Sequence, residues 1–276
     1  MIKYSILASG STGNSIYIGT DEYNLLIDAG LSGKKIEMGL EKIGVSPKDI
    51  DGILITHEHD DHVKGIGVLA RRYQIPIYAN AKTFENLPSQ IGEIDDSLKR
   101  ILETGTVKEF GKLQVESFAI SHDAAEPVGY VLRKENLKLS VVTDLGYVSQ
   151  KIKDKIIGSD AYIFEANHDV QMLRMSSYPW SVKQRILSDV GHLSNEASGE
   201  ALAEIITEVT QKVHLAHLSK ENNLIELARL TVKNILEDYG ITEEDVKLLD
   251  TFPDRPTSLE ILDRKKVKFK EILAVK

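Results

Sequence analysis

The hydrophobic positions of this 276-residue chain fall into two kinds of segment. Some are short runs rich in Ile, Val, Leu and Tyr and bounded by Gly, Asn or Asp, which is typical of strands. Others repeat apolar residues every three or four positions, which is typical of helices. The predicted strands cover residues 2–8, 15–18, 23–28, 53–56, 75–78, 113–120, 129–133, 137–143, 161–165, 213–216 and 246–249. The predicted helices cover residues 33–43, 63–73, 148–157, a long segment capped by Asn195, and 221–237.

The order of these elements predicts an α/β fold. Strands come first as a meander and then alternate with helices, in two rough halves, which favours two mixed sheets packed together with helices outside. No internal repeat, low-complexity stretch or linker divides the chain. We therefore expect a single domain over residues 1–276, with a flexible basic tail over residues 257–276.

Composition narrows the possible partners. The net charge of −8 argues against a non-specific nucleic-acid coat, although a local basic patch and metal ions can dominate one face. The basic run 264–270 is either such a patch or a solvated tail, and the tail is the favoured interpretation. There is no cysteine, which excludes disulfides and thiolate sites and fits a cytoplasmic protein. No run approaches the roughly 20 apolar residues of a membrane helix, so no membrane partner is expected.

The densest chemistry follows the apolar strand 53–56, in the stretch THEHDDH. If the backbone stays extended there, His57, His59 and Asp61 point to one side, and His62 can turn toward a second centre. Imidazole nitrogens and carboxylate oxygens suit Zn²⁺, Mn²⁺ or Fe. Packing does not explain three histidines and an aspartate in six residues, so we predict a metal site. Glu58 and Asp60 would point away from it.

Further candidate ligands follow other predicted strands, where a sheet-edge site collects side chains from distant parts of the chain. They are His122, Asp144, His168 and His217. Asp28 lies at the end of the predicted strand 23–28 and either orients a ligand histidine or is an ordinary strand-end aspartate. His214 lies within a strand and is interpreted as a core residue.

These residues resemble the motif signature of the metallo-β-lactamase superfamily, over residues 1 to about 250. The segments SILASGSTGNS, LLIDAGLSGKKI, ITHEHDDHVKGIGVLARRY, FEANHD, GHLSN and LAHLSKENN resemble the YycJ (WalJ) family of nucleases, and more distantly ribonuclease Z. The resemblance implies a four-layer αβ/βα sandwich and two divalent metal ions per chain, Mn²⁺ or Zn²⁺. It assigns His57, His59 and His122 to the first ion, Asp61, His62 and His217 to the second, and Asp144 to both. His168 remains an alternative to His217.

The resemblance also implies what the site does. The family is associated with DNA exonuclease activity, with 5′→3′ polarity suspected, so the expected partner is nucleic acid, and DNA in particular. Asp61 would orient and deprotonate the attacking water, and His192 in GHLSN would protonate the leaving group. Glu165 would support His192, although FEAN departs from the His-Glu-Ala-Thr motif of ribonuclease Z. Substrate contacts are expected from Ser11, Asn14, Ser219, Lys220 and Asn222, with a tight turn and ordinary capping as the alternatives.

Spacing separates this chain from some relatives. Only 21 residues separate His122 from Asp144, and 72 separate Asp144 from His217, which predicts a compact member without a gripping arm or clamp domain. The main alternative function is a small-molecule hydrolase that acts on a cyclic phosphodiester, thioester or lactone at the same two metals. A metal-binding regulator without catalysis is a third possibility, which the candidate proton donor disfavours.

Overall fold

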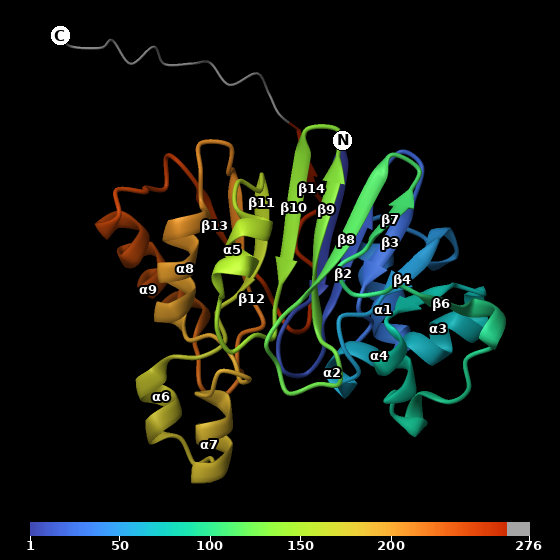
Figure 1. Ribbon diagram of the computed structural model, residues 1–276, viewed down its shortest axis with the longest axis horizontal. Coiled ribbons are helices and arrows are strands. Elements are labelled where there is room, and N and C mark those ends of the chain that lie inside the picture. The colour runs from blue at the N-terminus through green and yellow to red at the C-terminus, as the bar shows by residue number, and fades with distance from the viewer. Residues whose placement is uncertain (264–276) are drawn as a thin grey trace.

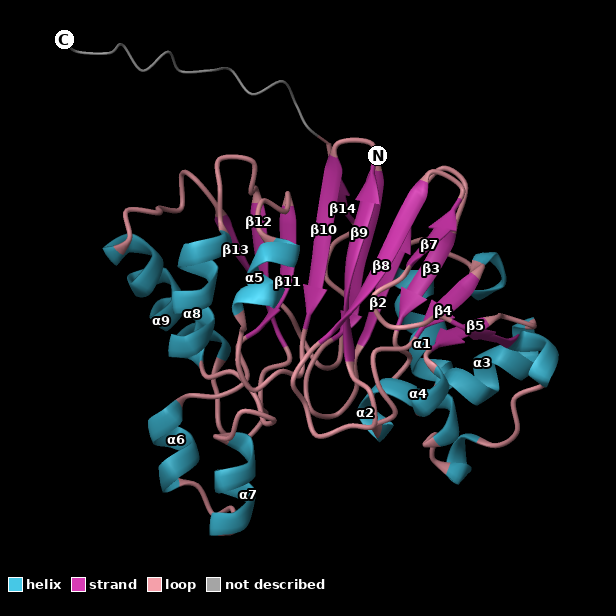
Figure 2. Ribbon diagram, in the orientation of Figure 1, coloured by secondary structure: helices cyan, strands magenta, loops and turns pink. Residues whose placement is uncertain are grey.

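The computed structural model describes residues 1–263 and shows two sheets that pack face to face, with helices on the outer side of each (Figures 1 and 2). The first sheet has the order β14-β1-β2-β3-β4-β5-β6. Its strands are β1 (Ile2–Ala8), β2 (Ser15–Gly19), β3 (Asn24–Ile27), β4 (Gly52–Leu54), β5 (Ile77–Ala79), β6 (Lys99–Ile101) and β14 (Glu260–Leu262).

The second sheet has the order β13-β12-β11-β10-β9-β8-β7. Its strands are β7 (Val107–Phe110), β8 (Leu113–Ala119), β9 (Val128–Lys134), β10 (Leu137–Val142), β11 (Ala161–Glu165), β12 (Lys212–Ala216) and β13 (Lys247–Asp250). In each sheet an antiparallel meander continues into parallel strands, β3 to β6 in the first and β10 to β13 in the second. Both sheets are therefore mixed, as predicted.

Nine α-helices occur in the part of the chain that is described. They are α1 (Gly33–Lys42), α2 (Asp60–Val63), α3 (Ile66–Tyr73), α4 (Ala81–Glu85), α5 (Gln150–Ile156), α6 (Val170–Met175), α7 (Trp180–Ile186), α8 (Asn195–Ile205) and α9 (Ile225–Asp238). Three short 3-10 helices, η1 (Pro47–Asp49), η2 (Ser89–Ile91) and η3 (Asp96–Leu98), complete the connections. None of the helices described is long and apolar enough to cross a membrane.

Three apolar clusters hold the four layers together. One lies between the sheets and contains Tyr4, Tyr130 and Ile163. The second joins the first sheet to α1 and α3, and the third joins the second sheet to α5, α8 and α9. Burial of these side chains stabilises the fold by about 25 cal/mol for each Å² of apolar surface removed from water. The αβ/βα sandwich expected from the sequence is confirmed.

Four features of the observed fold correct the predicted elements. The helix expected over 63–73 breaks at Gly65 into α2 and α3. The cap of α8 is Ser194 rather than Asn195, since the Ser194 hydroxyl accepts a hydrogen bond from the Ala197 N–H at 3.1 Å. The helix expected over 221–237 begins only at Ile225. The short helices α4, α6 and α7 and the strands β6 and β7 were not predicted.

The C-terminal prediction also needs correction. Residues 260–262, expected within a flexible tail, form β14 and pair antiparallel with β1. Leu262 of this strand is buried in the core between the sheets, and Ile261 on the other face is exposed. The basic run 264–270 lies outside the described residues.

Candidate metal centre

The carboxyl ends of strands from both sheets meet at one edge of the molecule. α2 follows β4 and α6 follows β11, and both lie at the lower edge in Figure 1. The HEHDDH stretch comes from the first sheet, after β4. His122, Asp144, Glu165 and His217 come from the second sheet, after or at the ends of β8, β10, β11 and β12. A site at this edge is therefore built from both sheets.

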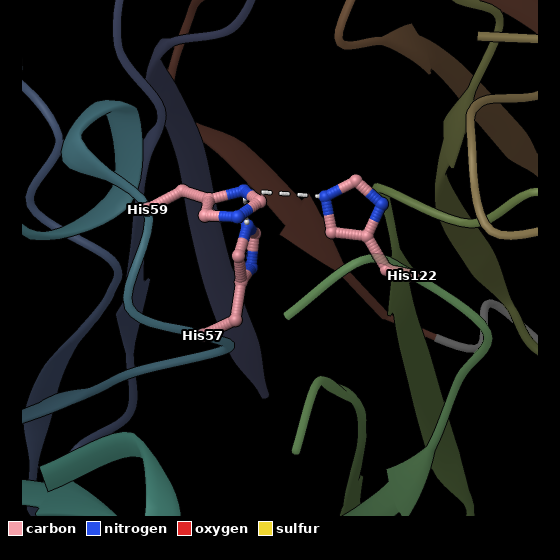
Figure 3. Close-up of side chains that lie close together, drawn as sticks. All are labelled: His57, His59 and His122. Carbon is pink, nitrogen blue, oxygen red and sulfur yellow. Dashed lines mark hydrogen bonds between the residues drawn. The ribbon is translucent and has the colours of Figure 1, made fainter. Parts of the chain in front are cut away.

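His57, His59 and His122 form the first ligand cluster (Figure 3). The His59 Nδ1 lies 3.1 Å from the His57 Nε2 and 3.3 Å from the His122 Nε2. The other nitrogens of His57 and His122 have partners outside the cluster. The His57 Nδ1 lies 3.0 Å from the Thr56 hydroxyl, and the His122 Nδ1 lies 3.2 Å from the Gly191 carbonyl. Those contacts fix the ring orientations and leave one nitrogen of each ring for a metal.

Asp61, His62 and His217 form the second cluster. The Asp61 Oδ2 lies 3.6 Å from the His62 Nε2 and 3.5 Å from the His217 Nε2. Alternation along an extended chain would have placed Asp61 with His57 and His59, and that expectation is wrong. The backbone turns into α2 at Asp60, which carries Asp61 to the side of His62.

Asp144 lies between the two clusters. Its carboxylate groups with His57 and His62 on one side and with His192, Glu165 and His217 on the other. The Asp144 Oδ2 is 3.4 Å from the His62 Nε2, and the Asp144 Oδ1 is 3.2 Å from the His217 Nδ1. This is the position that a carboxylate needs in order to serve two ions.

Two buried atoms test whether these residues fit a metal. Among the described residues, the Asp144 Oδ2 and the His217 Nε2 are both buried without a hydrogen-bond partner. An unpaired buried polar atom is costly, and a ligand ion removes that cost. A donor set of imidazoles and carboxylates without thiolate suits Zn²⁺ or Mn²⁺. The residues present therefore fit divalent metal ions.

Asp28 supports the second cluster from behind. Its Oδ2 lies 2.8 Å from the His62 Nδ1, and its Oδ1 accepts a hydrogen bond from the Thr56 N–H at 2.8 Å. The Thr56 hydroxyl donates to the same carboxylate at 2.8 Å. Of the two interpretations of Asp28, the structure supports the one in which it orients a ligand histidine. The sequence pattern did not single out Thr56 as a functional residue. Its position directly before the HEHDDH stretch is the feature that could have indicated such a role.

Several of these residues have an unusual backbone. Asp28, Asp144 and His217 have φ angles of 60°, 61° and 55°, in the left-handed region that residues with a side chain rarely adopt. Each follows the end of a strand, and the left-handed turn stops the strand and redirects the side chain toward the centre. Such strain is maintained only where the surrounding structure enforces it, and it concentrates at functional sites.

Burial and the dense charge of the centre shift several pKa values. Burial alone would raise the pKa of Asp144, but the neighbouring His217 and His62 hold it well below its usual range. Burial would lower the pKa of His217, but Asp144, Asp61 and Glu165 raise it to about 10. His57, in contrast, lies among other histidines, and burial with their charge lowers its pKa well below the ordinary value.

Glu165 and His192 form a pair beside the second cluster. The Glu165 Oε1 lies 2.8 Å from the His192 Nδ1 and 3.0 Å from the His217 Nδ1. The Glu165 Oε2 accepts a hydrogen bond from the Leu145 N–H at 2.9 Å. Although burial would raise it, the pKa of Glu165 is held at about 2 by His192 and His217. Glu165 thus orients the imidazole rings of His192 and His217. Because Glu165 contacts the Nδ1 of His192, the Nε2 of that ring is left free.

His168 does not join the ligands. It belongs to none of the ligand clusters found in residues 1–263, whereas His217 belongs to two. Its ring is buried, and burial lowers its pKa to about 4. The structure therefore supports His217 over the alternative.

The expected substrate-binding residues divide into two groups. Ser11, Ser219 and Lys220 line a cavity of about 260 Å³ next to the centre. Asn14 and Asn222 are buried and do not face solvent. The Asn14 amide nitrogen lies 3.1 Å from the His62 Nε2, so Asn14 contacts the metal ligands, and its assignment to substrate is not supported. Glu58 and Asp60 do point away, to the Ala125 N–H and to Gln90.

Comparisons with known proteins agree with this geometry. A family model described as a β-lactamase superfamily domain matches residues 23–215. The chain is 52% identical over 260 residues to exodeoxyribonuclease YycJ of Bacillus anthracis, covering 94% of this chain and 98% of that protein. It is 50% identical over 261 residues to exodeoxyribonuclease WalJ of Streptococcus pneumoniae serotype 2, covering 93% and 97%.

Solved structures share the fold at low sequence identity. The metallo-β-lactamase fold protein YhfI from Bacillus subtilis superposes with a TM-score of 0.69 at 14% identity, covering 93% of this chain and 98% of that one. The short form of human tRNase Z superposes with a TM-score of 0.63 at 15% identity, covering 94% and 100%. From the family model and the two relatives at half identity, the chain belongs to the metallo-β-lactamase superfamily and, within it, to the family of the YycJ and WalJ exodeoxyribonucleases.

Proposed function

We propose that this protein is a DNA exonuclease that hydrolyses phosphodiester bonds at a centre of two divalent ions. The observation that carries the proposal is the His192–Glu165 pair, 2.8 Å apart, at the side of the ligand clusters. A phosphodiester differs from a thioester in needing a proton on its leaving oxygen. The two relatives at half identity, both named exodeoxyribonucleases, supply DNA as the polymer.

The ligand set supports two ions. His57, His59 and His122 would hold one, Asp61, His62 and His217 the other, and Asp144 both. Mn²⁺ and Zn²⁺ both suit these donors. When bound, divalent ions supply a water of lowered pKa and positive charge against the phosphate.

The protein's own groups would move the protons. The Asp61 side chain is 25% exposed, so its carboxylate can orient the attacking water and accept a proton from it. The His192 side chain is 18% exposed, and its Nε2 would donate a proton to the leaving oxygen. Glu165 is buried and ionised, and it holds the His192 Nδ1 proton so that the ring presents the correct face.

The decisive experiment uses metal-loaded protein with 5′- or 3′-labelled single- and double-stranded DNA and RNA. Progressive release of mononucleotides from one DNA end, lost in Asp61→Ala, would support the proposal and define the polarity, for which 5′→3′ is our expectation. No cleavage of any polymer, together with turnover of a thioester or of bis(p-nitrophenyl) phosphate, would overturn it.

That outcome would favour the alternative function, a small-molecule hydrolase at the same centre. The cavity beside Ser11, Ser219 and Lys220 is large enough for part of a metabolite. We further propose that the protein acts in the cytoplasm, which the absence of cysteine supports.

A further inference from the structure

The helices α6 and α7 form a hairpin that projects from the sandwich at the edge where the metal centre lies (Figures 1 and 2). The hairpin comprises residues 169–190, and Glu165 precedes it while His192 follows it. The sequence predicted a compact chain without an arm, so this projection is unexpected. No residue of the hairpin belongs to the ligand clusters of the described chain.

The base of the hairpin is part of the wall of the centre. The Ile186 carbonyl accepts a hydrogen bond from the His192 N–H at 3.0 Å. The Gly191 carbonyl lies 3.2 Å from the Nδ1 of the ligand His122. Arg185 pairs with Asp123, and the Ser121 hydroxyl donates to the Asp189 carbonyl at 2.7 Å. A polymer that leaves the centre on this side therefore meets the hairpin.

The hairpin is held together as one rigid piece. The Lys183 side chain is buried, and its ammonium group donates to the Arg174 and Ser176 carbonyls at 2.7 Å each. The Asp169 carboxylate caps α6 by accepting from the Met172 N–H at 2.7 Å. A preformed surface loses little conformational entropy when it binds a ligand.

The tip of the hairpin exposes apolar and aromatic surface. Trp180 is 64% exposed and Met175 is 87% exposed. Both lie at the ends of α6 and α7 that are far from Glu165 and His192. A large exposed aromatic ring on a rigid support is what stacking on a nucleobase requires, and every base offers a face for it.

The charge of the hairpin differs from that of the whole chain. The hairpin, residues 169–190, carries three basic residues and the two acids Asp169 and Asp189, whereas the chain has a net charge of −8. Lys183 is buried against carbonyl groups and Arg185 pairs with Asp123. Arg174 is exposed, and no acidic partner for it occurs among residues 1–263. An exposed arginine and an exposed aromatic ring on one hairpin are complementary to a phosphate backbone with unstacked bases.

We propose that the α6–α7 hairpin binds the single strand of DNA on its way to the metal centre, with Trp180 stacked on a base and Arg174 near the backbone. The proposal rests on the function proposed above. α7 has 7 residues and spans about 10 Å, and a strand rises about 3.4 Å per nucleotide in duplex geometry. Trp180 would thus contact a base a few nucleotides from the scissile bond.

The test compares substrates of different length. Trp180→Ala should raise KM for a single-stranded 12-mer about 5- to 100-fold, since one lost base–aromatic contact has that effect. Hydrolysis of a dinucleotide and of bis(p-nitrophenyl) phosphate should be unchanged, because neither is long enough to reach Trp180 at the tip of the hairpin. Trp180→Phe should retain most of the affinity. Tyr239→Ala is the matched control, because Tyr239 is 63% exposed at the far end of α9.

Fluorescence gives a second measurement, because Trp180 is the only tryptophan in the chain. A hydrolysis-resistant phosphorothioate 12-mer should quench the emission of the metal-loaded protein, and Arg174→Gln should reduce the salt dependence of this binding by about one ion. DNA cleavage that Trp180→Ala leaves unchanged, with unquenched emission, would overturn the hairpin proposal but not the nuclease. A wild-type protein that cleaves no polymer overturns both. An emission shift with anionic phosphatidylglycerol vesicles and none with the 12-mer would also overturn the hairpin proposal.

Discussion

Asp28 lies behind the second candidate ligand cluster and contacts one of its histidines. Its carboxylate holds the His62 ring at 2.8 Å and in turn accepts hydrogen bonds from Thr56. Asp28→Asn keeps an acceptor for Thr56 but removes the charge that aligns His62. We expect the affinity for the metal at the second cluster to fall about 10- to 100-fold, as measured by calorimetric titration.

The control for this prediction is Asp51→Asn. Asp51 also accepts a backbone hydrogen bond, from the Asn24 N–H at 2.7 Å, but it lies at the other end of β4, away from the centre. Equal metal affinities for the wild type and Asp28→Asn would show that the carboxylate only terminates β3.

A substitution of His192 distinguishes the two proposed functions, because only one of them needs its imidazole. His192→Ala should lower kcat for DNA about 10²- to 10⁴-fold if the ring is the general acid. A thioester, whose leaving thiolate needs no proton, should be hydrolysed at nearly the wild-type rate. The two rates are measured on the same preparation, with metal content determined for each variant. A parallel loss on both substrates would contradict the assignment and indicate damage to the centre.

The sequence indicated which histidines and aspartates would cluster, because their chemistry is visible in their spacing, and their binding of metal stays a prediction. It predicted the supporting contacts poorly. Asn14 was assigned to substrate, but the left-handed Gly10, with a φ of 143°, lets the Gly10 N–H bond to the Asn14 side chain and draws that side chain inward. A turn of this kind produces no hydrophobic period in the sequence, so the sequence pattern does not predict it.

At the scale of elements, buried apolar segments were predicted correctly and exposed ones were missed. β1 and β11 match their predicted bounds because their side chains are almost all buried, so apolar character marks them. α6 and α7 have only 6 and 7 residues and bury few side chains, so they carry little apolar period. β6 and β7 are edge or partly exposed strands, and they were missed for the same reason.

Two glycines, one in the loop after β3 and one inside α1, give opposite predictions. A Cβ on Gly30 would lie 1.6 Å from the Asp61 carbonyl oxygen, so Gly30→Ala must displace α2 and the ligand that it carries. We expect loss of metal-dependent activity and of about 3 kcal/mol of unfolding free energy. A Cβ on Gly39, inside α1, would meet only Leu7 at 3.6 Å or more. Gly39→Ala should stabilise by about 1 kcal/mol with unchanged activity.

Urea denaturation and DNA cleavage of the two variants test this comparison. If Gly30→Ala keeps wild-type metal content and activity, then the loop after β3 does not fix the position of Asp61.

His214 links the two sheets and gives a pH prediction. It lies on β12, is buried, and hydrogen-bonds the Tyr4 hydroxyl of β1 at 3.0 Å. Burial lowers its pKa from 6.5 to about 4, so the unfolded state binds the proton more tightly. The neutral ring therefore contributes stability above pH 6.5, and about 3 kcal/mol of it is lost as the pH falls toward 4.

His214→Leu should make the unfolding free energy less dependent on pH between 6.5 and 4 by about that amount, whatever its effect at neutral pH. Denaturation at several pH values measures it. His168 titrates in the same range and remains in the variant, so the slope should diminish rather than vanish. An unchanged slope would contradict the assignment.

At the scale of the whole molecule, the candidate metal centre lies where the two sheets meet, and the sheets also meet through apolar packing and the Tyr4–His214 hydrogen bond. Four ligands follow β4 of the first sheet, and His122, Asp144 and His217 follow strands of the second. Ions held as proposed would bind groups from both sheets. Because an unfolded chain does not preform such a site, metal binding would contribute to folding.

Chelation should therefore lower the melting temperature of the whole protein. A metal at 100 times its Kd contributes about 2.7 kcal/mol, which corresponds to about 5 °C for a chain of this length. Calorimetry with and without a chelator measures the shift, and return of the metal should reverse it. In His57→Ala/His59→Ala, which lacks two ligands of the first cluster, the shift should shrink to the part due to the second ion. If the chelator lowers the melting temperature of that variant as much as it lowers that of the wild type, then only the second cluster holds a metal. If the chelator does not change the melting temperature of the wild type, then a metal does not help to hold the two sheets together.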